Sequence, residues 1–195
     1  APKEFDLIVF PHCSWYMRSM DELDRSFARA RQWGQRQGYT EWEERLRDMK
    51  QLPRLLSALL QIQIRTVSDA GPGNIYSLVS GHQARSAAGR TGWRIEKDHV
   101  IGTSADMEDG RTREIDWSFK MAKELAEASE SGVTAYQREI VDAEAKLLSD
   151  VSDAEQNMSL DSFMFYRQVI RLGRGCETLQ TQQPRRVAAL DPISI

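Results

Sequence analysis

The feature that most constrains the fold is a dense apolar run at residues 52–67, with the sequence LPRLLSALLQIQIRTV. A helix built from this run is apolar around most of its circumference, so it has to be covered on several sides. A membrane-spanning helix needs about 18 or more consecutive apolar residues, whereas Arg54 and Arg65 bracket a shorter stretch. We therefore expect a buried helix at the centre of the core and no contact with a membrane. Residues 61–67 alternate apolar and polar side chains, so this end also fits a short strand.

Composition narrows the class of protein further. The chain has 195 residues, of which 41% are hydrophobic and 28% charged, enough for one domain with its own core. Its formal net charge of -3 argues against a general nucleic-acid binder, which is usually strongly basic. Cys13 and Cys176 are too few and too far apart for a disulfide framework or a zinc site. Residues 1–13 lack the features of a signal peptide, so we expect a cytoplasmic protein of a reducing compartment, or one within a virion.

Two capping boxes near the start of the chain predict a pair of helices. Ser19 and Glu22 form the first box, and Thr40 and Glu43 form the second. In such a box the hydroxyl accepts from an exposed backbone N–H while the carboxylate reaches back to the cap. Gly38 between them is typical of a helix end. The pattern therefore predicts a helical hairpin that leads into the central helix.

The middle of the chain is less regular. Residues 5–10 read as a short strand, and residues 93–103 and 113–119 also have extended character. The turn-forming residues 107–110 between the last two segments predict a β-hairpin. Irregular segments on a rigid scaffold commonly carry binding residues, so we expect binding residues in this region.

The last third of the chain returns to helical patterns. We expect helices over 120–129, from Thr134 onward and from Ser159 onward. The predicted fold is therefore mainly α, within the α+β class: helical hairpins in a bundle around a buried central helix, with a small β-hairpin. We expect a single α-rich domain over residues 1–175 and an extended C-terminal arm over residues 176–195.

Self-association is suggested by the helix that begins at Thr134. Its apolar residues follow alternating steps of three and four, which is typical of a narrow coiled-coil seam. A stripe inside an intramolecular bundle explains the same spacing, and so does a groove for a partner helix. The C-terminal arm adds paired arginines and an apolar end. The predicted oligomer interface consists of Ile140, Leu147, Val151, Ala154, Met158, Arg185, Arg186, Leu190 and Ile193.

A group of arginines around one tryptophan forms the predicted nucleic-acid contact. Guanidinium forks and an aromatic plane suit the backbone and bases of single-stranded RNA or DNA. Acidic residues between them weaken this interpretation. The predicted contact residues are Arg85, Arg90, Trp93, Arg94, Arg111 and Arg113.

An acidic cluster in the predicted hairpin gives an alternative. Carboxylates close together can hold a divalent metal for a nuclease or another phosphoryl-transfer enzyme. Glu114 and Asp116 would share one face of a strand. A solvated hairpin tip explains the same composition. The carboxylates concerned are Asp106, Glu108, Asp109, Glu114 and Asp116.

The segment 12–19, HCSWYMRS, follows a predicted strand and resembles the His-Cys signature of Cys-dependent phosphatases. That signature separates its Cys from its Arg by five residues, whereas four separate Cys13 from Arg18 here. The intervening residues are also too bulky to form a tight phosphate cradle. We therefore expect Cys13 to be a buried free thiol at the end of a strand.

Together these patterns favour a non-enzymatic structural subunit that self-associates, of the coat, scaffold or connector type found in viruses and phages, with nucleic-acid contact through the arginines. The alternatives are the metal-dependent nuclease and a regulatory adaptor that binds a partner helix. No glycine-containing segment matches a nucleotide-binding fingerprint, and no cofactor is expected.

Overall fold

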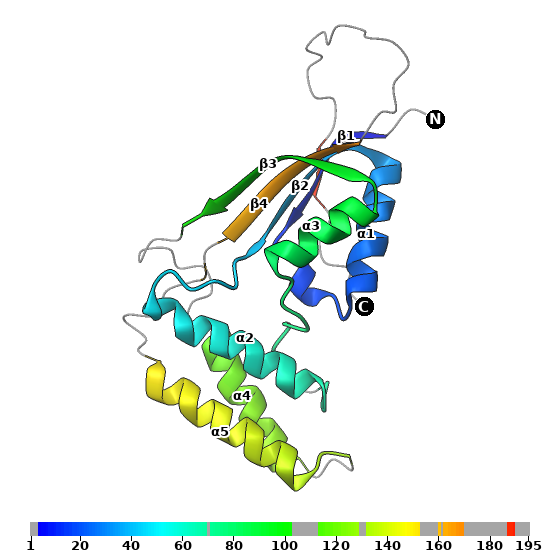
Figure 1. The fold of residues 1–195 in the computed structure, drawn as a ribbon. Helices are drawn as coiled ribbons and strands as arrows, with labels where there is room; N and C mark the ends of the chain where they lie inside the picture. Colours follow the sequence, from blue (N-terminus) through cyan, green and yellow to red (C-terminus); the bar gives the residue numbers. More distant parts are fainter. Residues whose placement is uncertain are drawn as a thin grey trace, which may run out of the picture. The chain divides into compact units, whose positions relative to one another are not determined.

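The structure of the chain is a computed structural model, shown in Figure 1. It describes residues 4–69, 71–102, 113–128, 132–152, 160, 162–169 and 187–189. The chain divides into two compact units. The first consists of Ala1–Glu41, Val79–Val100 and Phe163–Ile195, and the second of Trp42–Leu78 and Ile101–Ser162.

A five-stranded sheet forms the framework of the first unit. Its strands lie in the order β3-β4-β2-β1-β5. Strand β1 pairs in parallel with β2 on one side and with β5 on the other, so that Ile8 lies opposite both Gln37 and Ala188. The strands are β1 (Phe5–Pro11), β2 (Gly34–Trp42), β3 (Trp93–Ile101), β4 (Ser162–Val169) and β5 (Val187–Ala189).

Helix α1 (Met20–Trp33) makes the crossover that two parallel strands require between β1 and β2. Its predicted N-cap is confirmed, because the Ser19 side chain accepts from the backbone N–H of Glu22 at 3.3 Å. The helix runs into β2 without a loop, and Gly34 still donates its N–H to the carbonyl of Ala30. A Cβ at Gly34 would lie 2.8 Å from Cδ1 of the buried Ile8, so this junction requires glycine.

Helix α3 (Gly81–Arg90) begins at a capping box made by Ser80 and Gln83. It packs with α1 and the strands around an aromatic group in which Tyr39 meets Phe27 edge-on, at 5.4 Å between ring centroids, and stacks on Phe165 at 4.9 Å. The core of the first unit includes Ile8, Phe10, Leu23, Phe27, Ala30, Tyr39, Ala84, Ala87, Ala88, Trp93 and Phe165.

The second unit is built from three helices, α2 (Leu52–Arg65), α4 (Arg113–Glu127) and α5 (Ala135–Val151). The central apolar run is indeed helical, and Pro53 lies in its first turn, where it breaks no hydrogen bond. The helix packs against both α4 and α5, in line with the expectation that it is covered on several sides, although Leu59 is 47% exposed. The core of this unit is Leu60, Ile64, Ile115, Met121, Ala122, Leu125, Val141 and Leu148.

A buried polar network joins α2 to α4 in the second unit. Arg54 is 1% exposed, stacks at 4.0 Å on the ring of Trp42 and lies 3.9 Å from the carboxylate of Glu114. Gln61 donates to the same carboxylate at 3.1 Å and to Ser118 at 3.2 Å. The stacked ring and the carboxylate compensate part of what burying the Arg54 charge costs.

The prediction of a mainly α fold is wrong. Residues 34–42 form a strand, so Gly38 does not end a helix and Thr40 does not cap one. Gln37, Tyr39 and Glu41 are buried in alternation along this strand, which is the period of a sheet. Residues 162–169, expected in a helix, form β4.

The predicted β-hairpin over residues 93–119 is also wrong. Strand β3 exists, but its partner in the sheet is β4, and residues 113–119 are the first half of α4. The helix predicted from Thr134 is confirmed, with Gln137 completing its capping box. The predicted domain boundary at residues 175 and 176 lies outside the described residues and stays a prediction. None of the described helices combines the length and hydropathy needed to cross a membrane.

Candidate functional site

The first unit places a group of polar side chains where the parallel strands β1 and β2 end. Ligands of open α/β sheets bind outside the carboxyl ends of the strands. His12 follows β1 directly and still donates its backbone N–H to the Thr40 carbonyl at 2.9 Å. Its φ of 43° lies in the left-handed region that side chains other than glycine rarely adopt. Backbone held in this way is concentrated at functional sites, so this edge of the sheet is a candidate functional site.

Glu41 is the buried charge at the centre of this group, with 3% of its surface exposed. It lies on β2, on the same face as Tyr39. Ser14, in the short 3-10 helix η1 (Ser14–Tyr16), donates its backbone N–H to Glu41 Oε2 at 2.9 Å. The Ser14 hydroxyl donates to the same oxygen. Two donors on one oxygen favour the ionised form of a buried carboxylate.

Tyr39 extends this group by one hydrogen bond. Its hydroxyl lies 2.7 Å from Ser14 Oγ. Because the single Ser14 hydroxyl proton points to Glu41, the proton shared with Tyr39 comes from the tyrosine. The order of donation is therefore Tyr39 to Ser14 to Glu41, and every proton in this chain points toward the carboxylate.

His12 faces the other oxygen of this carboxylate. Its Nδ1 lies 3.8 Å from Glu41 Oε1, too far for a hydrogen bond but close enough for a direct charge interaction. The negative charge favours the tautomer with its proton on Nδ1, which leaves Nε2 as the basic nitrogen. The His12 side chain is 29% exposed and that of Glu41 is 4% exposed. The imidazole can therefore meet a substrate, whereas the carboxylate is held behind it.

Aromatic rings border the same loop. The Trp15 ring lies 5.8 Å from the imidazole of His12 and 5.7 Å from the ring of Tyr16, between centroids. Both side chains are half-buried. Ring faces next to a fixed negative charge attract cations and planar apolar groups.

Cys13 lies in the same loop but has no nucleophilic role. The expectation of a buried free thiol is confirmed. Burial, reinforced by the charge of Glu41, raises the pKa of the Cys13 thiol to about 12. A thiol with that pKa carries almost no thiolate at neutral pH, so it cannot attack phosphate as a phosphatase cysteine does.

The structure pairs several of the arginines predicted to bind nucleic acid with carboxylates. Arg85 meets Asp98 at 2.6 Å, Arg90 meets Asp24 at 2.9 Å, and Arg94 meets Glu96 at 3.4 Å. Trp93 is 3% exposed and donates to the Phe27 carbonyl, so its ring is not available for stacking on a base. Arg113 is on α4 in the second unit, and Arg111 lies outside the described residues. Nucleic-acid contact stays a prediction.

The acidic residues proposed as metal ligands are not brought together where the structure describes them. Glu114 and Asp116 are on a helix, so they do not share a face as they would in a strand. Glu114 is bound to Gln61 instead. Asp106, Glu108 and Asp109 lie outside the described residues. Within the described ranges no three or more side chains of His, Cys, Asp or Glu gather as metal ligands.

The predicted oligomer interface falls only partly on described residues. Leu147 is 51% exposed, and Ile140 and Val151 are half-buried. The side of α5 that packs in the core carries Val141 and Leu148 instead, one residue along from the predicted stripe. The other predicted interface residues, Ala154, Met158, Arg185, Arg186, Leu190 and Ile193, lie outside the described part of the chain.

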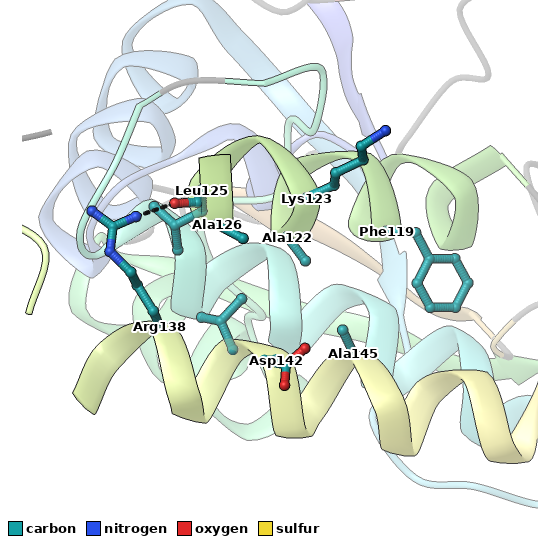
Figure 2. A pocket seen from close by; sticks show the side chains of 9 residues that line it. Phe119, Ala122, Lys123, Leu125, Ala126, Arg138, Asp142 and Ala145 are labelled. Carbon is teal, nitrogen blue, oxygen red and sulfur yellow. Dashed lines mark hydrogen bonds between the residues drawn. The ribbon is translucent and has the colours of Figure 1, made fainter. Parts of the chain in front are cut away.

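A shallow pocket of about 210 Å³ lies between α4 and α5 in the second unit (Figure 2). Small side chains such as Ala122 and Ala145 leave this space. Arg138 at its edge donates to the Leu125 carbonyl, where it stabilises the end of α4. The lining includes Lys123 and Asp142, but both side chains are largely exposed and each is paired with a charge on its own helix, so this pocket is a weaker candidate than the group around Glu41.

The sequence contained a usable signal for this site. Segment 12–19 stands out in the sequence because of Cys13, whereas the site uses His12 and Ser14 from it. Tyr39 and Glu41 were missed because their segment was assigned to a turn and a helix. Recognising 34–42 as a second buried parallel strand would have placed its last polar residues beside those that follow β1.

The sheet identifies the fold class. It contains parallel strands, with a helical crossover between β1 and β2, so the fold is a Rossmann-like α/β arrangement and not a helical bundle. No family model and no curated protein sequence matches the chain. The likeness therefore rests on solved structures.

One such structure is a cyclopropane-fatty-acyl-phospholipid synthase-like protein from Lactobacillus casei, with a TM-score of 0.67 and 20% sequence identity. The match covers 86% of this chain and 57% of that protein, so the chain spans a little over half of its length. A cyclopropane synthase from Mycobacterium tuberculosis matches with a TM-score of 0.41 at 15% identity, over 85% of this chain and 56% of that one. The second match is too distant to carry an argument.

These comparisons overturn the prediction of a coat, scaffold or connector subunit. The solved structure that shares this fold with a TM-score of 0.67 is named as a synthase-like protein and not as a component of a virion. The expectation of a location within a virion loses its support for the same reason.

Proposed function

We propose that this chain is part of an S-adenosylmethionine-dependent transferase. Its acceptor site is formed by His12, Ser14, Tyr39 and Glu41, where the parallel strands β1 and β2 end. One observation carries the proposal: a buried carboxylate faces a partly exposed imidazole where two parallel strands end. The fold shared with the Lactobacillus casei protein supports the choice of class.

His12 is the proposed general base. An acceptor that forms a new bond to carbon through an O–H, N–H or activated C–H group has to lose a proton. His12 Nε2 is the nitrogen left basic by the charge on its other side, and its side chain is exposed enough to reach a bound acceptor. The proton passes from the acceptor to Nε2, while the electron pair of the broken bond to hydrogen stays with the acceptor.

Glu41 is the proposed positioning residue for that base. Its charge, 3.8 Å from His12 Nδ1, stabilises the imidazolium that proton uptake creates. Ser14 holds the carboxylate by two hydrogen bonds, and Tyr39 holds Ser14. The carboxylate therefore needs no rearrangement when the charge on His12 appears, which is the condition for effective electrostatic stabilisation.

The residues of this loop fit the cationic part of the implied cofactor. S-adenosylmethionine carries a sulfonium centre and supplies an electrophilic carbon when it is bound. The rings of Trp15 and Tyr16 and the charge of Glu41 are groups that attract such a cation. We therefore assign Trp15 and Tyr16 to the cofactor side of the site, and His12, with Glu41 behind it, to the acceptor side.

The direct test is isothermal titration calorimetry of the protein with S-adenosylmethionine and S-adenosylhomocysteine, followed by transfer of a radiolabelled methyl group to candidate acceptors. The acceptors are small hydroxyl and amine compounds in one set and vesicles of unsaturated phospholipid in another, since the similar structure is named for a fatty-acyl-phospholipid activity. We expect binding of both cofactor forms and labelling in one set.

Two variants make the result specific. His12→Gln removes the base and should lower transfer by about a hundredfold or more while cofactor binding stays. His82→Gln, at an exposed position on α3 of the first unit, is the matched control and should leave transfer unchanged. Failure of both cofactor forms to bind, or full transfer by His12→Gln, would contradict the proposal.

A further inference from the structure

The side chain that follows Glu41 is anchored in the second unit. Trp42 is the last residue of β2, so its side chain and that of Glu41 point to opposite faces of the strand. The residue pairs of β2 with β1 end at Thr40, so both residues lie beyond this ladder. Trp42 is 4% exposed, and the guanidinium of Arg54 lies over its ring, 4.0 Å from the centroid. A desolvated cation over a tryptophan ring is a strong form of this contact, so it fixes the orientation of the ring.

Arg54 is itself held in place by two helices. It lies near the start of α2, is 1% exposed, and its Nη1 is 3.9 Å from Oε1 of Glu114 on α4. The other oxygen of that carboxylate accepts from the Gln61 amide of α2 at 3.1 Å. This network sets the position of the guanidinium, and the guanidinium sets the position of the Trp42 ring.

The end of β2 is therefore fixed at two consecutive residues by two different sets of contacts. On one face of the strand Ser14 binds the Glu41 carboxylate, and on the other face Arg54 holds the Trp42 ring. Glu41 and Trp42 share one peptide plane, so a turn of the backbone at Trp42 also redirects the Cα–Cβ bond of Glu41. A charge that stabilises a reacting group has to stay within about 0.5 Å of its productive position.

We propose that Arg54 is a positioning residue of the candidate site, which acts through Trp42 to hold the Glu41 carboxylate at its distance from His12. This role rests on the proposed function, in which Glu41 stabilises the imidazolium that forms when His12 takes up a proton. Arg54 acts along the chain, through the peptide bond between residues 41 and 42, and the role requires no contact with acceptor or cofactor. The polar network of the second unit therefore controls the geometry of a site whose reacting groups lie in the first.

Kinetics separate this role from a purely structural one. Arg54→Met removes the cation over Trp42 and leaves the Glu114 charge buried, whereas Arg54→Met with Glu114→Leu removes the cation and leaves no buried charge. The double variant should regain much of the stability, while its kcat for methyl transfer stays about tenfold or more below that of the wild type because the carboxylate is displaced. The KM for S-adenosylmethionine should not change. A residue that only stabilises the fold would give back kcat together with stability.

Leu60→Ala is the matched control. Leu60 is 2% exposed in the core of the second unit, so its truncation also destabilises that unit. The contact between Arg54 and Trp42 stays in place in this variant. Transfer measured below the unfolding transition should therefore remain within about twofold of the wild type, as for two independent parts of a structure.

A measurement without any reaction tests the same geometry. In protein with isotope-labelled histidine, the His12→Gln variant identifies the imidazole NMR signals of His12 among those of His82 and His99. The field of the Glu41 charge at the imidazole depends on their separation. The His12 signals should therefore shift in Arg54→Met and in the double variant, but not in Leu60→Ala. The signals of His82 and His99 should stay in place in all three variants.

Three results would overturn the proposal: a double variant with the His12 signals of the wild type, a double variant with the kcat of the wild type, or an equal shift of the His12 signals in Leu60→Ala. The NMR comparison needs neither cofactor nor acceptor. If neither cofactor form binds, the proposed function fails, and the His12 signals still decide whether Arg54 positions Glu41.

Discussion

Ser14 donates both its backbone N–H and its hydroxyl to one oxygen of Glu41, and so ties the loop after β1 to the end of β2 through a single buried carboxylate. The second oxygen of that carboxylate is left facing His12. The two strands are 23 residues apart in the sequence, counting from the last residue of β1 to the first of β2 (34 − 11 = 23). Their polar ends are joined by side chains and not only by the ladder of backbone hydrogen bonds.

Removing the Ser14 hydroxyl should destabilise the first unit. In Ser14→Ala, Glu41 loses a donor and the buried Tyr39 hydroxyl loses its acceptor, at a cost of about 1–3 kcal/mol in the free energy of unfolding. Urea denaturation measures it. Tyr39→Phe should cost much less in the Ser14→Ala background than alone, since the shared hydrogen bond is already gone. Additive costs would contradict the described chain of donation.

Burial of Cys13 should make stability depend on pH in the alkaline range. The pKa of its thiol rises from 9.0 to about 12 on folding, so the folded protein holds this proton more tightly than the unfolded chain does. The resulting stability is complete below pH 9 and is lost as the pH rises from 9 toward 12, by about 1.4 kcal/mol for each pH unit.

The comparison of wild type with Cys13→Ala isolates this effect from other groups that titrate at high pH. Urea denaturation at pH 8, 9 and 10 should show the wild type losing more stability than the variant above pH 9. Parallel slopes over this range would mean that the thiol is not held in its protonated form by the fold.

Arg54 should be among the most sensitive positions of the second unit. Arg54→Met leaves the buried Glu114 carboxylate without its cation, which costs about 3–5 kcal/mol in the free energy of unfolding. The double variant Arg54→Met with Glu114→Leu should recover a large part of that loss, because no uncompensated charge remains. Chemical denaturation of the three proteins gives the coupling free energy, and a double variant no more stable than Arg54→Met would refute this account.

Gly34 and Gly38 on the same strand should respond differently to alanine. At Gly34 the new Cβ meets Ile8 Cδ1 at 2.8 Å in the core, so Gly34→Ala should cost about 1–3 kcal/mol. At Gly38 the nearest atom is Val9 Cγ1 at 3.9 Å, an ordinary contact, so Gly38→Ala should change stability by about 0.5 kcal/mol or less. Thermal unfolding ranks the two, and equal costs would argue against the tight junction.

Local signals in the sequence were enough for several elements. Ser19 and Thr134 were predicted as caps and act as caps, because a capping box lies within four residues and needs no tertiary context. The helix at residues 52–67 and the strand at residues 5–10 were found for a similar reason. Each has an apolar pattern that one kind of element explains best over most of its length, although residues 61–67 also fit a strand.

Other elements are predicted wrongly because their apolar residues fit both the period of a helix and the period of a strand. In α4, Ile115, Trp117 and Phe119 alternate as in a strand, yet Ile115, Phe119 and Ala122 also fall on one side of a helix. The packing of α4 against α2 stabilises the helix and not the strand. In β4 the run at residues 163–166 is apolar throughout and has no period, so only its place in the sheet distinguishes it from a helix.

The candidate site depends on β2, which the sequence patterns also assign wrongly. Glu41 belongs to a site only if residues 34–42 are a strand beside β1, and that pairing joins distant parts of the chain. Pattern reasoning works within a window of about 18 residues or fewer, and the separation of the two strands exceeds it. His12 and Ser14 lie in a segment that the sequence patterns draw attention to, whereas no pattern in the sequence points to their partner Glu41.

Because no loop separates α1 from β2, the length of α1 determines which residues of β2 face the site. Side chains on a strand point alternately to opposite faces, so one residue added after Trp33 would carry Tyr39 and Glu41 to the far face of the sheet. No flexible segment lies at this junction to absorb the change. The chemistry at the strand ends can therefore be varied by exchanging residues, but not by lengthening the chain at the junction of α1 and β2.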